Sequence, residues 1–338
     1  MSNSFLSEVY RPAPSNLETE HESLFKRSAK FVLNKPEIRS LKNVFIFWQG
    51  QIFRNGLILT ESLATPIFLK KYNQKFFLIC LLKAFLKRNL HFFFKQQFLI
   101  VHDEWSFNYF HWLTDTLTRI FLVKDSLSTS VLILPDTFCL SYHTFVLKKF
   151  GINFIQNTND KKILFVSKVL LPKHTAPAGN FNPTILRNAV EFLTNDNNNN
   201  KLFMGERIYI SRQNSSIRYI LNEIDVINCL KTKGFAILNI EDFNFEDQMS
   251  ILSKAKYLIS IHGAGLTNLM FMPEGGSVLE LRKKGGSEIY NCYFNLAAVF
   301  NHRFYYQPCE SDSDDSVQVA NIFVDIDKLN KNLVLMGV

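Results

Sequence analysis

Tyr257-Leu-Ile-Ser-Ile-His-Gly-Ala-Gly-Leu-Thr-Asn-Leu-Met-Phe-Met-Pro273 is the stretch around which the chain is organised. Its first five residues are apolar and predict a strand, which breaks at the glycine turn before the helix-compatible run Leu266 to Phe271. Glycines let a backbone approach a ligand closely, and the first N–H groups of a helix favour negative charge. A second apolar run, Ser277 to Leu281, follows with Glu280 inside it. This order is typical of nucleotide sites at the carboxyl ends of parallel strands, although an ordinary strand–turn–helix connection has the same local pattern.

The second half of the chain alternates short apolar runs with amphipathic ones. Strands are expected over residues 207–210, 235–240, 257–261, 277–281, 303–306 and 319–326. Helices are expected over residues 222–233, 245–256, 266–271, 287–300 and 328–336. Strands and helices that alternate at this length predict an α/β domain with a doubly wound parallel sheet.

The polar run Asn195 to Asn200 is the clearest linker in the sequence, although a long surface loop would have the same composition. We therefore expect an N-terminal α/β domain over residues 1–200 and a nucleotide-binding domain over residues 201–338. Residues 1–40 are polar and predict an irregular arm over the first domain, and the C-terminal tail could pack back on that domain as well. Within residues 1–200 the pattern predicts strands at 43–48, 97–101, 131–134 and 163–171, and helices at 107–123, 141–150 and 183–193. Residues 75–89 are apolar on most sides and predict a largely buried helix.

The composition is that of a globular chain, since 47% of the 338 residues are hydrophobic and 20% are charged. The net charge of +8 favours an acidic partner such as a nucleotide, a phosphorylated lipid or an anionic membrane face. Lys and Arg are scattered without a run of five like charges, which argues against a nucleic-acid groove. The five cysteines are far apart and form no C-x-x-C pair, so neither a disulfide framework nor a zinc site is expected.

The N-terminus shows no basic start followed by an apolar core, as a signal peptide would. The longest apolar segment, residues 76–82, is much shorter than the roughly 20 residues of a membrane span. A soluble cytoplasmic protein, free or peripheral to the inner membrane face, is the resulting expectation.

The first polar cluster is His102-Asp-Glu-Trp-Ser-Phe-Asn-Tyr-Phe-His-Trp-Leu-Thr-Asp115. In a helix that begins near Phe107, His111 and Asp115 stand at i and i+4, and Asn108 shares their face. A carboxylate beside an imidazole orients it and raises its basicity, as a general base requires. The alternative is a hydrogen-bonded helix pair with structural aromatics around it.

The second cluster follows the predicted strand 207–210 and contains Ser211, Arg212 and Arg218, with Glu223 beyond. Two guanidinium groups at the end of a strand could hold a diphosphate in bidentate fashion. A surface loop with two solvated arginines is the alternative.

The third cluster is the opening stretch. His262 and the N–H groups of the turn could face a pyrophosphate, Asn268 could contact the pyrophosphate or the sugar, and Glu280 could accept from ribose hydroxyls. The candidate donor-binding residues of this turn are Gly263, Ala264, Gly265 and Thr267. For Glu280 the alternative is a helix cap or an exposed strand end. The turn lacks the lysine of a Walker-type loop, and no H-x-x-x-H or D-x-D spacing occurs, so we expect neither a metal nor another cofactor.

The three clusters together resemble the sequence blocks of glycosyltransferase family 61. The first resembles the family's Asn-Tyr-x-His-Trp-Leu-x-Asp block, here Asn108 to Asp115. The second resembles a Tyr-Ile-Ser-Arg block followed by an arginine and an Asn-Glu pair, here Tyr209 to Arg212, Arg218 and Asn222-Glu223. The third resembles a His-Gly-Ala-Gly-Leu-Thr-Asn-x-x-Phe-Met-Pro block followed by a Leu-Glu strand, here His262 to Pro273 and Leu279-Glu280. The resemblance covers residues 98–282, and three blocks in order are more specific than any single glycine turn.

The resemblance implies a GT-B architecture, in which two Rossmann-like doubly wound domains face a cleft and the nucleotide-sugar donor binds the C-terminal half. It implies inverting transfer without a required metal, from a donor such as a UDP-sugar. Bacterial members of the family look like capsule or surface-polysaccharide enzymes, so the implied acceptor is a hydroxyl of a glycan or lipid-linked glycan. Residues before 97 match no block of the family.

Two classes of function remain as hypotheses. In the enzyme hypothesis, His111 held by Asp115 is the base, or Asp115 is the base itself, while Arg212 and Arg218 stabilise the leaving diphosphate. The other hypothesis is a non-catalytic nucleotide-sugar or glycan-binding protein, and the intact first cluster favours catalysis over it. A NAD-dependent enzyme needs a G-x-G-x-x-G after a first strand, which the sequence does not contain.

Overall fold

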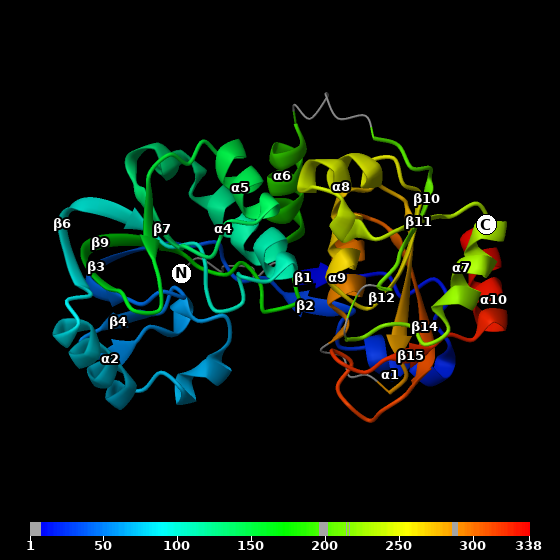
Figure 1. Cartoon of the computed structure of the whole chain (residues 1–338), viewed down its shortest axis with the longest axis horizontal. Helices are drawn as coiled ribbons and strands as arrows, with labels where there is room; N and C mark the ends of the chain where they lie inside the picture. Colours follow the sequence, from blue (N-terminus) through cyan, green and yellow to red (C-terminus); the bar gives the residue numbers. More distant parts are fainter. Residues whose placement is uncertain (1–7, 196–201, 214, 216, 286–289) are drawn as a thin grey trace, which may run out of the picture. The chain divides into compact units, whose positions relative to one another are not determined.

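The computed structural model describes residues 8–195, 202–213, 215, 217–285 and 290–338, and it divides the chain into two compact units. We call residues 34–178 the inserted unit, because it lies in sequence between the two parts of the other unit. Residues 1–33 and 179–338 form the flanking unit (Figure 1). Both units combine a sheet with helices, so the expected two-part α/β organisation is confirmed.

The flanking unit is built on a six-stranded sheet in the order β11-β10-β12-β13-β14-β15. The first five strands in this order pair in parallel, and only β15 is antiparallel. Counted along the chain from β10, the parallel strands stand in the order 2-1-3-4-5, which is that of a doubly wound sheet. The strands are β10 (Arg207–Ile210), β11 (Ala236–Leu238), β12 (Tyr257–Ile261), β13 (Ser277–Lys283), β14 (Arg303–Ser311) and β15 (Ile322–Phe323). The parallel sheet predicted for the second half is therefore confirmed.

Helices cover both faces of this sheet, as Figure 1 shows. Helices α7 (Glu223–Thr232) and α10 (Ile326–Met336) pack on the face that carries Tyr209 and Ile259. The opposite face is covered by α8 (Phe245–Leu252), by the 3₁₀ helix η7 (Ala264–Phe271) and by α9 (Cys292–Val299). Helix α10 packs against α7 and β14, so the C-terminal tail completes the flanking unit. The sequence had suggested that this tail could pack back on the first domain instead.

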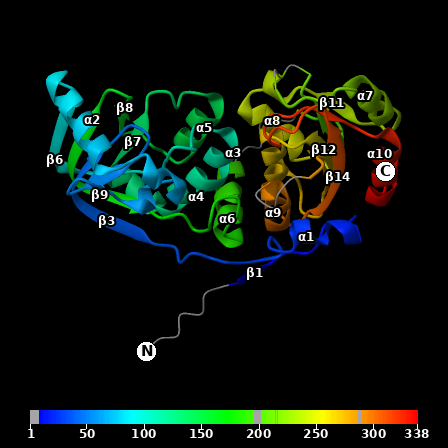
Figure 2. The same cartoon turned by 90° about the horizontal axis from the view of Figure 1, so that it is seen from below.

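The N-terminal segment also belongs to the flanking unit. It contains β1 (Glu8–Tyr10), the 3₁₀ turn η1 (Thr19–His21), α1 (Glu22–Phe25) and β2 (Lys30–Val32), and β1 and β2 pair as antiparallel strands. The backbone N–H of Ser15 donates to the carbonyl of Phe304 at 2.7 Å, and Asn16 bonds the main chain of Tyr306 through both ends of its amide. Figure 2 shows α1 beside β14 and α9. The N-terminal arm was predicted to lie over the first domain, but it packs on the sheet of the flanking unit.

The division between the units falls at residues 178 and 179, earlier than the expected boundary at residue 200. The reason is α6 (Pro183–Thr194), which packs against α9. The guanidinium of Arg187 donates to the carbonyl of Val299 and, at 2.9 Å, to the side chain of Asn301. Most of the Asn195–Asn200 run lies outside the described residues.

The inserted unit has a seven-stranded sheet in the order β5-β4-β3-β9-β6-β7-β8. The strands from β9 to β8 are parallel, whereas β3, β4 and β5 are antiparallel to their neighbours. This half is thus a mixed sheet and differs from the second doubly wound parallel sheet that was expected. The short turns at Gly50 and Gly56, both at positive φ, join β3, β4 and β5 as hairpins, which only antiparallel strands allow. The strands are β3 (Ile38–Ile46), β4 (Ile52–Arg54), β5 (Leu57–Ile58), β6 (Leu90–Leu99), β7 (Val131–Pro135), β8 (Ile155–Thr158) and β9 (Ile163–Pro172).

The helices of the inserted unit match the expected segments, with one difference in burial. They are α2 (Gln74–Leu86), α3 (Tyr109–His111), the π-helical η4 (Trp112–Thr116), α4 (Leu117–Leu122) and α5 (Ser141–Lys149), with 3₁₀ turns at Thr60–Ser62, Pro66–Lys70 and Lys124–Thr129. Helix α2 was expected to be largely buried, but it buries only Phe77 and Ala84 fully. None of the helices in the described part of the chain combines the length and the apolar character that crossing a bilayer needs.

Candidate active site

The first polar cluster lies on an interrupted helix in the inserted unit. Asn108 caps the helix, since its side-chain oxygen accepts from the backbone N–H of Phe110 at 2.9 Å. The helix then widens into the π turn η4 before it returns to α geometry in α4. Such π turns occur frequently at functional sites. The expected helix is therefore present, and Asn108 serves first as its cap.

The His111 and Asp115 side chains meet as the sequence spacing predicts. Nδ1 of His111 lies 2.7 Å from Oδ2 of Asp115, and both side chains are mostly buried but reach the surface, with 21% and 15% exposed. When the Nδ1–H donates to the carboxylate, Nε2 keeps its lone pair and can accept a proton. This pair has the geometry of an oriented general base.

A buried ion pair shapes the loop before this helix. The Asp103 carboxylate lies 3.2 Å from a guanidinium nitrogen of Arg119 and 3.0 Å from Nε2 of His174. Its other oxygen accepts from the backbone N–H of Trp105 at 3.0 Å. The Trp105 ring then packs over the His111 ring with 4.9 Å between centroids. Asp103 thereby fixes an aromatic wall beside the imidazole.

Burial and charge compete within this loop. Burial raises the pKa of the Asp103 carboxyl, but the neighbouring His174 and Arg119 outweigh burial and hold that pKa well below its usual range. Burial raises the pKa of Glu104, which accepts from Gln51 at 3.1 Å. The fully buried Arg119 also interacts electrostatically with Glu104 and Asp115. One buried guanidinium is thus paired with Asp103 and attracted by two further carboxylates, one of which belongs to the candidate base pair.

The second and third clusters meet at the carboxyl ends of two neighbouring inner strands of the flanking unit's sheet. Strands β10 and β12 are neighbours, and the chain order reverses between them because β11 lies on the other side of β10. Ser211 and Arg212 follow β10, and His262 and Gly263 follow β12. Open α/β sheets bind ligands at such a switch point, outside the carboxyl ends of the strands.

Two arginines converge on Gly263. A Cβ added at this glycine would lie 3.0 Å from a terminal nitrogen of Arg212 and 3.1 Å from one of Arg218. Burial lowers the pKa of Arg218, and the charge of Arg212 lowers it further. The buried Nε atoms of both arginines have no hydrogen-bond partner within the described structure. Two like charges with unused donors over a glycine turn form a site for an anion.

Glu223 and Ser211 hold the loop that carries Arg212. Oε1 of Glu223 accepts from the Tyr209 hydroxyl at 2.8 Å and from the backbone N–H of Arg212 at 3.2 Å. The Ser211 hydroxyl accepts from the N–H of Gln213 at 3.2 Å. Both side chains are buried. They therefore support the arginine loop, whereas the sequence had placed them among the donor-binding residues.

The rest of the glycine turn is packed into the fold. A Cβ on Gly265 would lie 3.1 Å from Cγ2 of Ile210, so this glycine lets η7 approach β10 closely. Asn268 is fully buried and donates to the carbonyl of Gly265 at 3.2 Å. Thr267 is fully buried beside the Tyr293 hydroxyl. Ala264 begins the 3₁₀ helix, and its N–H and that of Gly265 are the first of its free donors.

His262 is held by Glu280 from the neighbouring strand. Nδ1 of His262 bonds the Glu280 carboxylate, which is completely buried and has Arg282 3.7 Å from its second oxygen. The His262 ring meets the Tyr293 ring edge to face at 5.0 Å. Glu280 was expected to accept from ribose hydroxyls. In the structure its carboxylate orients His262 instead, which fixes the imidazole beside the arginine pair.

Sequence reasoning missed the residues that close this site from α9 and β13. Tyr293 lies at the start of α9, and the side-chain oxygen of Asn291, just before this helix, accepts from Arg282 at 2.9 Å. Burial raises the pKa of Tyr293 well above its usual value, so its hydroxyl stays neutral. Arg282 stands two residues after Glu280 on β13 and therefore shares its face, which is a signal the sequence does contain.

One group of potential metal ligands occurs in the described part of the chain. Glu18, Glu20 and His21 bring their ligand atoms within 4.8 Å of one another. The two carboxylates are exposed, and Nδ1 of His21 lies 3.0 Å from the Tyr306 hydroxyl. Exposed acidic groups beside a histidine already engaged with a hydroxyl do not by themselves define a metal site, so we assign none.

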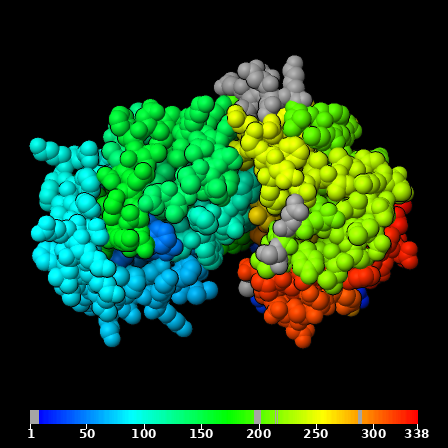
Figure 3. All heavy atoms as spheres, viewed as in Figure 1, coloured from blue at the N-terminus to red at the C-terminus, as the bar shows by residue number. Residues whose placement is uncertain are grey.

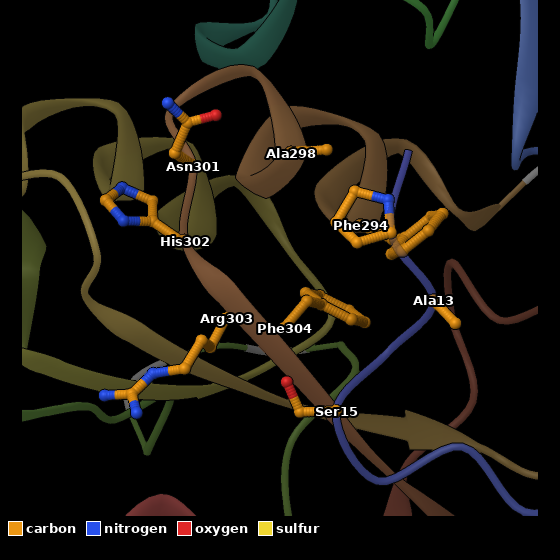
Figure 4. Close-up of a pocket in the computed structure, with 9 residues that line it drawn as sticks. Ala13, Ser15, Phe294, Ala298, Asn301, His302, Arg303 and Phe304 are labelled. Carbon is orange, nitrogen blue, oxygen red and sulfur yellow. The ribbon is translucent and has the colours of Figure 1, made fainter. Parts of the chain in front are cut away.

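A cavity of about 250 Å³ lies at the amino end of β14, the opposite edge of the sheet from the glycine turn. Figure 4 shows the N-terminal segment crossing β14 at this cavity. Its lining residues are Pro12, Ala13, Ser15, Phe294, Ala298, Asn301, His302, Arg303 and Phe304. No candidate residue lines it, so it is separate from the arginine site.

Comparison with known proteins places the chain in a family. The family model described as Glycosyltransferase 61 matches residues 109–279, just over half of the chain. The EGF domain-specific O-linked N-acetylglucosamine transferase of Bos taurus is 34% identical over 98 residues, which are 28% of this chain and 18% of that protein. The protein O-linked-mannose beta-1,4-N-acetylglucosaminyltransferase 2 of Danio rerio is 30% identical over 114 residues, which are 29% of this chain and 20% of the relative. The chain thus spans about a fifth of these animal relatives. The residues that the family model matches include His111, the arginine loop and the glycine turn. The chain belongs to the glycosyltransferase 61 family.

Proposed function

We propose that this protein transfers a sugar from a nucleotide diphosphate donor to a hydroxyl group of a glycan. The observation that carries the proposal is the convergence of Arg212 and Arg218 on Gly263, at the switch point of a doubly wound sheet. Family membership and relatives that are named as N-acetylglucosamine transferases support it.

The donor diphosphate would lie against the arginine pair. Two guanidinium groups with unused donors can bond phosphate oxygens in bidentate fashion, and they stabilise the charge that develops as the sugar leaves. The first N–H groups of η7 carry positive partial charge and would also face the diphosphate. His262, oriented by Glu280, directly precedes this turn. The proposed site therefore neutralises the diphosphate without a metal.

The acceptor would be activated by the His111–Asp115 pair. Nε2 of His111 takes the proton of the acceptor hydroxyl while that oxygen forms a bond to the anomeric carbon. The bond from the anomeric carbon to the diphosphate oxygen breaks on the opposite face, and the nucleotide diphosphate leaves with that electron pair. This course inverts the configuration at the anomeric carbon. The GT-B architecture that the resemblance implies is part of this proposal.

Several finer points of the proposal rest on the resemblance of this sequence to the sequence blocks of the family. These are a UDP-linked donor, a cytoplasmic location and an acceptor in surface polysaccharide or a lipid-linked glycan. The relatives named above are animal enzymes whose names refer to protein-linked acceptors. A screen of acceptors should therefore include both free glycans and glycoproteins.

A non-catalytic nucleotide-sugar-binding protein is the second candidate. It would need the arginine site but not an oriented base. The 2.7 Å contact between His111 and Asp115 therefore favours the enzyme.

The test separates donor binding from catalysis. Donor hydrolysis and transfer are first screened over a panel of nucleotide sugars, and the nucleotide's affinity is measured by calorimetry. We expect His111→Ala and Asp115→Asn to lower turnover by about 10²- to 10⁴-fold with unchanged nucleotide affinity. Arg212→Ala should weaken nucleotide binding by roughly 10- to 100-fold, because it removes charge-assisted hydrogen bonds.

The matched controls are Asp125→Asn, an exposed acid of the inserted unit, and Arg303→Ala, an exposed arginine at the opposite edge of the same sheet. Both should behave as wild type. Wild-type turnover in both base variants would refute the assigned base, and unchanged nucleotide affinity in Arg212→Ala would refute the clamp.

A further inference from the structure

The outer side of α2 exposes large apolar side chains. Leu82, Phe85 and Leu86 are 59%, 67% and 71% exposed, and Leu78 and Ile79 are exposed as well. At about 100° per residue these five side chains span roughly 120° of the helix circumference. The other side of the helix buries Phe77 and Ala84 against the sheet. A helix on a protein surface that faces water normally turns its apolar side chains toward the core. An apolar stripe on the outward side of a helix is therefore unusual.

Two phenylalanines of β6, which follows α2 in sequence, are exposed as well. The rings of Phe92 and Phe94 stack at 6.2 Å and are 54% and 67% exposed. A chain of ring contacts links them to α2, because Phe77 contacts Phe45, Phe45 contacts Phe165, and Phe165 contacts Phe92 at 5.8 Å. Phe92 and Phe94 therefore lie on the face of the sheet that α2 covers. We call these two rings and the five exposed side chains of α2 the apolar surface; Figure 3 shows its segment in light blue to cyan.

Positive charge accompanies this surface. Residues 62–102 contain seven Lys and Arg and no Asp or Glu. Lys83 and Lys87 stand one turn apart along one border of the stripe, and Lys75, Arg88 and Lys95 are exposed close to it in sequence. The asymmetry extends to the whole unit. The inserted unit holds 19 Lys and Arg against eight Asp and Glu, a net charge of +11, whereas the flanking unit holds 19 against 22, a net charge of −3.

We propose that the apolar surface docks the protein on the anionic face of a lipid bilayer. Helix α2 would lie in the plane of the membrane, with its leucines and phenylalanines among the acyl chains and its lysines at the headgroup phosphates. Apolar side chains at the centre with cations at the border match the boundary between hydrocarbon and anionic headgroups. This inference stands on exposure and charge alone and does not depend on the proposed glycosyl transfer.

The charge pattern argues against the other occupants of such a surface. A second copy of the chain, related by a twofold axis, would bring the two sets of lysines together. A nucleic acid would need cations or stacking rings at the centre of the surface, where this one has leucines.

The experiment is sedimentation of the full chain with phospholipid vesicles. We expect most of the protein to bind vesicles that contain about a third phosphatidylglycerol, with at least about tenfold weaker binding to pure phosphatidylcholine and release at high salt. The double variant Leu82→Asp, Phe85→Asp should lose binding by at least about tenfold. Both positions are exposed, so the variant should keep the wild-type circular dichroism spectrum and unfolding midpoint.

A matched control is the double variant Val334→Asp, Leu335→Asp on α10, where the side chains are 70% and 59% exposed. It should bind vesicles as the wild type does. Lys83→Glu with Lys87→Glu should remove the preference for the anionic vesicles.

Three results would overturn the proposal. The first is wild-type protein that stays in the supernatant with anionic vesicles, and the second is equal loss of binding in the α10 control. The third is a wild-type dimer that Leu82→Asp, Phe85→Asp converts into a monomer, with no vesicle binding by the wild type, which would make the apolar surface a contact between copies of the chain.

Discussion

Gly263→Ala tests the anion site with the smallest possible change. The backbone at Gly263 is extended, with φ of 168° and ψ of 171°, which alanine also adopts, so the substitution introduces no backbone strain. Its methyl group would lie 3.0 Å from Arg212 and 3.1 Å from Arg218. Both neighbours are the far ends of flexible side chains, so they can move aside. The fold should tolerate the change, whereas the phosphate-binding geometry should not.

The expected loss follows from the contacts that the guanidinium groups make. A hydrogen bond to a charged group contributes about 1.5–3 kcal/mol, so displacing one arginine from a phosphate should weaken nucleotide binding by roughly 10- to 150-fold. Calorimetry with the nucleotide identified in the donor screen measures this directly. The unfolding midpoint should stay at the wild-type value.

Gly265→Ala is the matched control in the same turn. Its methyl group would lie 3.1 Å from Cγ2 of Ile210, inside the packing of η7 on β10. Overpacking of this kind lowers the unfolding free energy by about 1–3 kcal/mol, which corresponds to roughly 2–12 °C in the unfolding midpoint for a unit of this size. The two alanines should thus separate affinity from stability. Wild-type nucleotide affinity in Gly263→Ala would refute the arginine site at this turn.

Two further predictions concern stability. Glu280→Ala should lower the free energy of unfolding by about 3–5 kcal/mol, because it leaves His262 and Arg282 in the interior without their shared carboxylate. The control is Glu310→Ala, which breaks the exposed pair with Lys284 and should leave the urea midpoint unchanged. Equal effects of the two variants on the urea midpoint would contradict this reasoning. Burial lowers the pKa of His102 to about 4 in the folded protein, so between pH 6.5 and pH 4 the unfolded chain binds a proton that the folded protein does not. The stability of the inserted unit is therefore greatest above pH 6.5 and falls as the pH decreases, and at pH 5.5 His102 accounts for a loss of about 1.4 kcal/mol. Urea unfolding at pH 7.5 and pH 5.5 should show a smaller decrease in His102→Gln, and an equal decrease would count against this cause.

Local patterns predicted the parts of the molecule that depend on neighbours in sequence. The strands and helices of the flanking unit follow from apolar runs of the right length, and the glycine turn follows β12 as expected. The His111–Asp115 contact is a consequence of helical spacing, so it was also predictable. The convergence of Arg212 and Arg218 on Gly263 was expected only as a possible clamp, since two arginines in a loop do not reveal where their side chains meet.

Other features depend on tertiary contacts that the sequence does not display. The apolar residues all around α2 predict burial equally well on every side, and only the structure shows which side packs on the sheet. The antiparallel strands β3 to β5 are a different case, because the short turns at Gly50 and Gly56 that reverse the chain are local features and could have predicted these strands. Glu280 was assigned to a ligand because it ends an apolar run, but a buried partner from the neighbouring strand, His262, already occupies it.

The pairing of the N-terminal segment with β14 has a consequence for the order of folding during synthesis. Asn16 and Tyr306 are separated by 290 residues, so the segment is made long before its partner strand. At about 5–20 residues per second, translation leaves it unpaired for roughly 15–60 seconds. The inserted unit has all its strands within residues 34–178 and can close while the segment waits. A nascent chain interrupted before β14 would therefore carry a finished inserted unit between two unfinished ends.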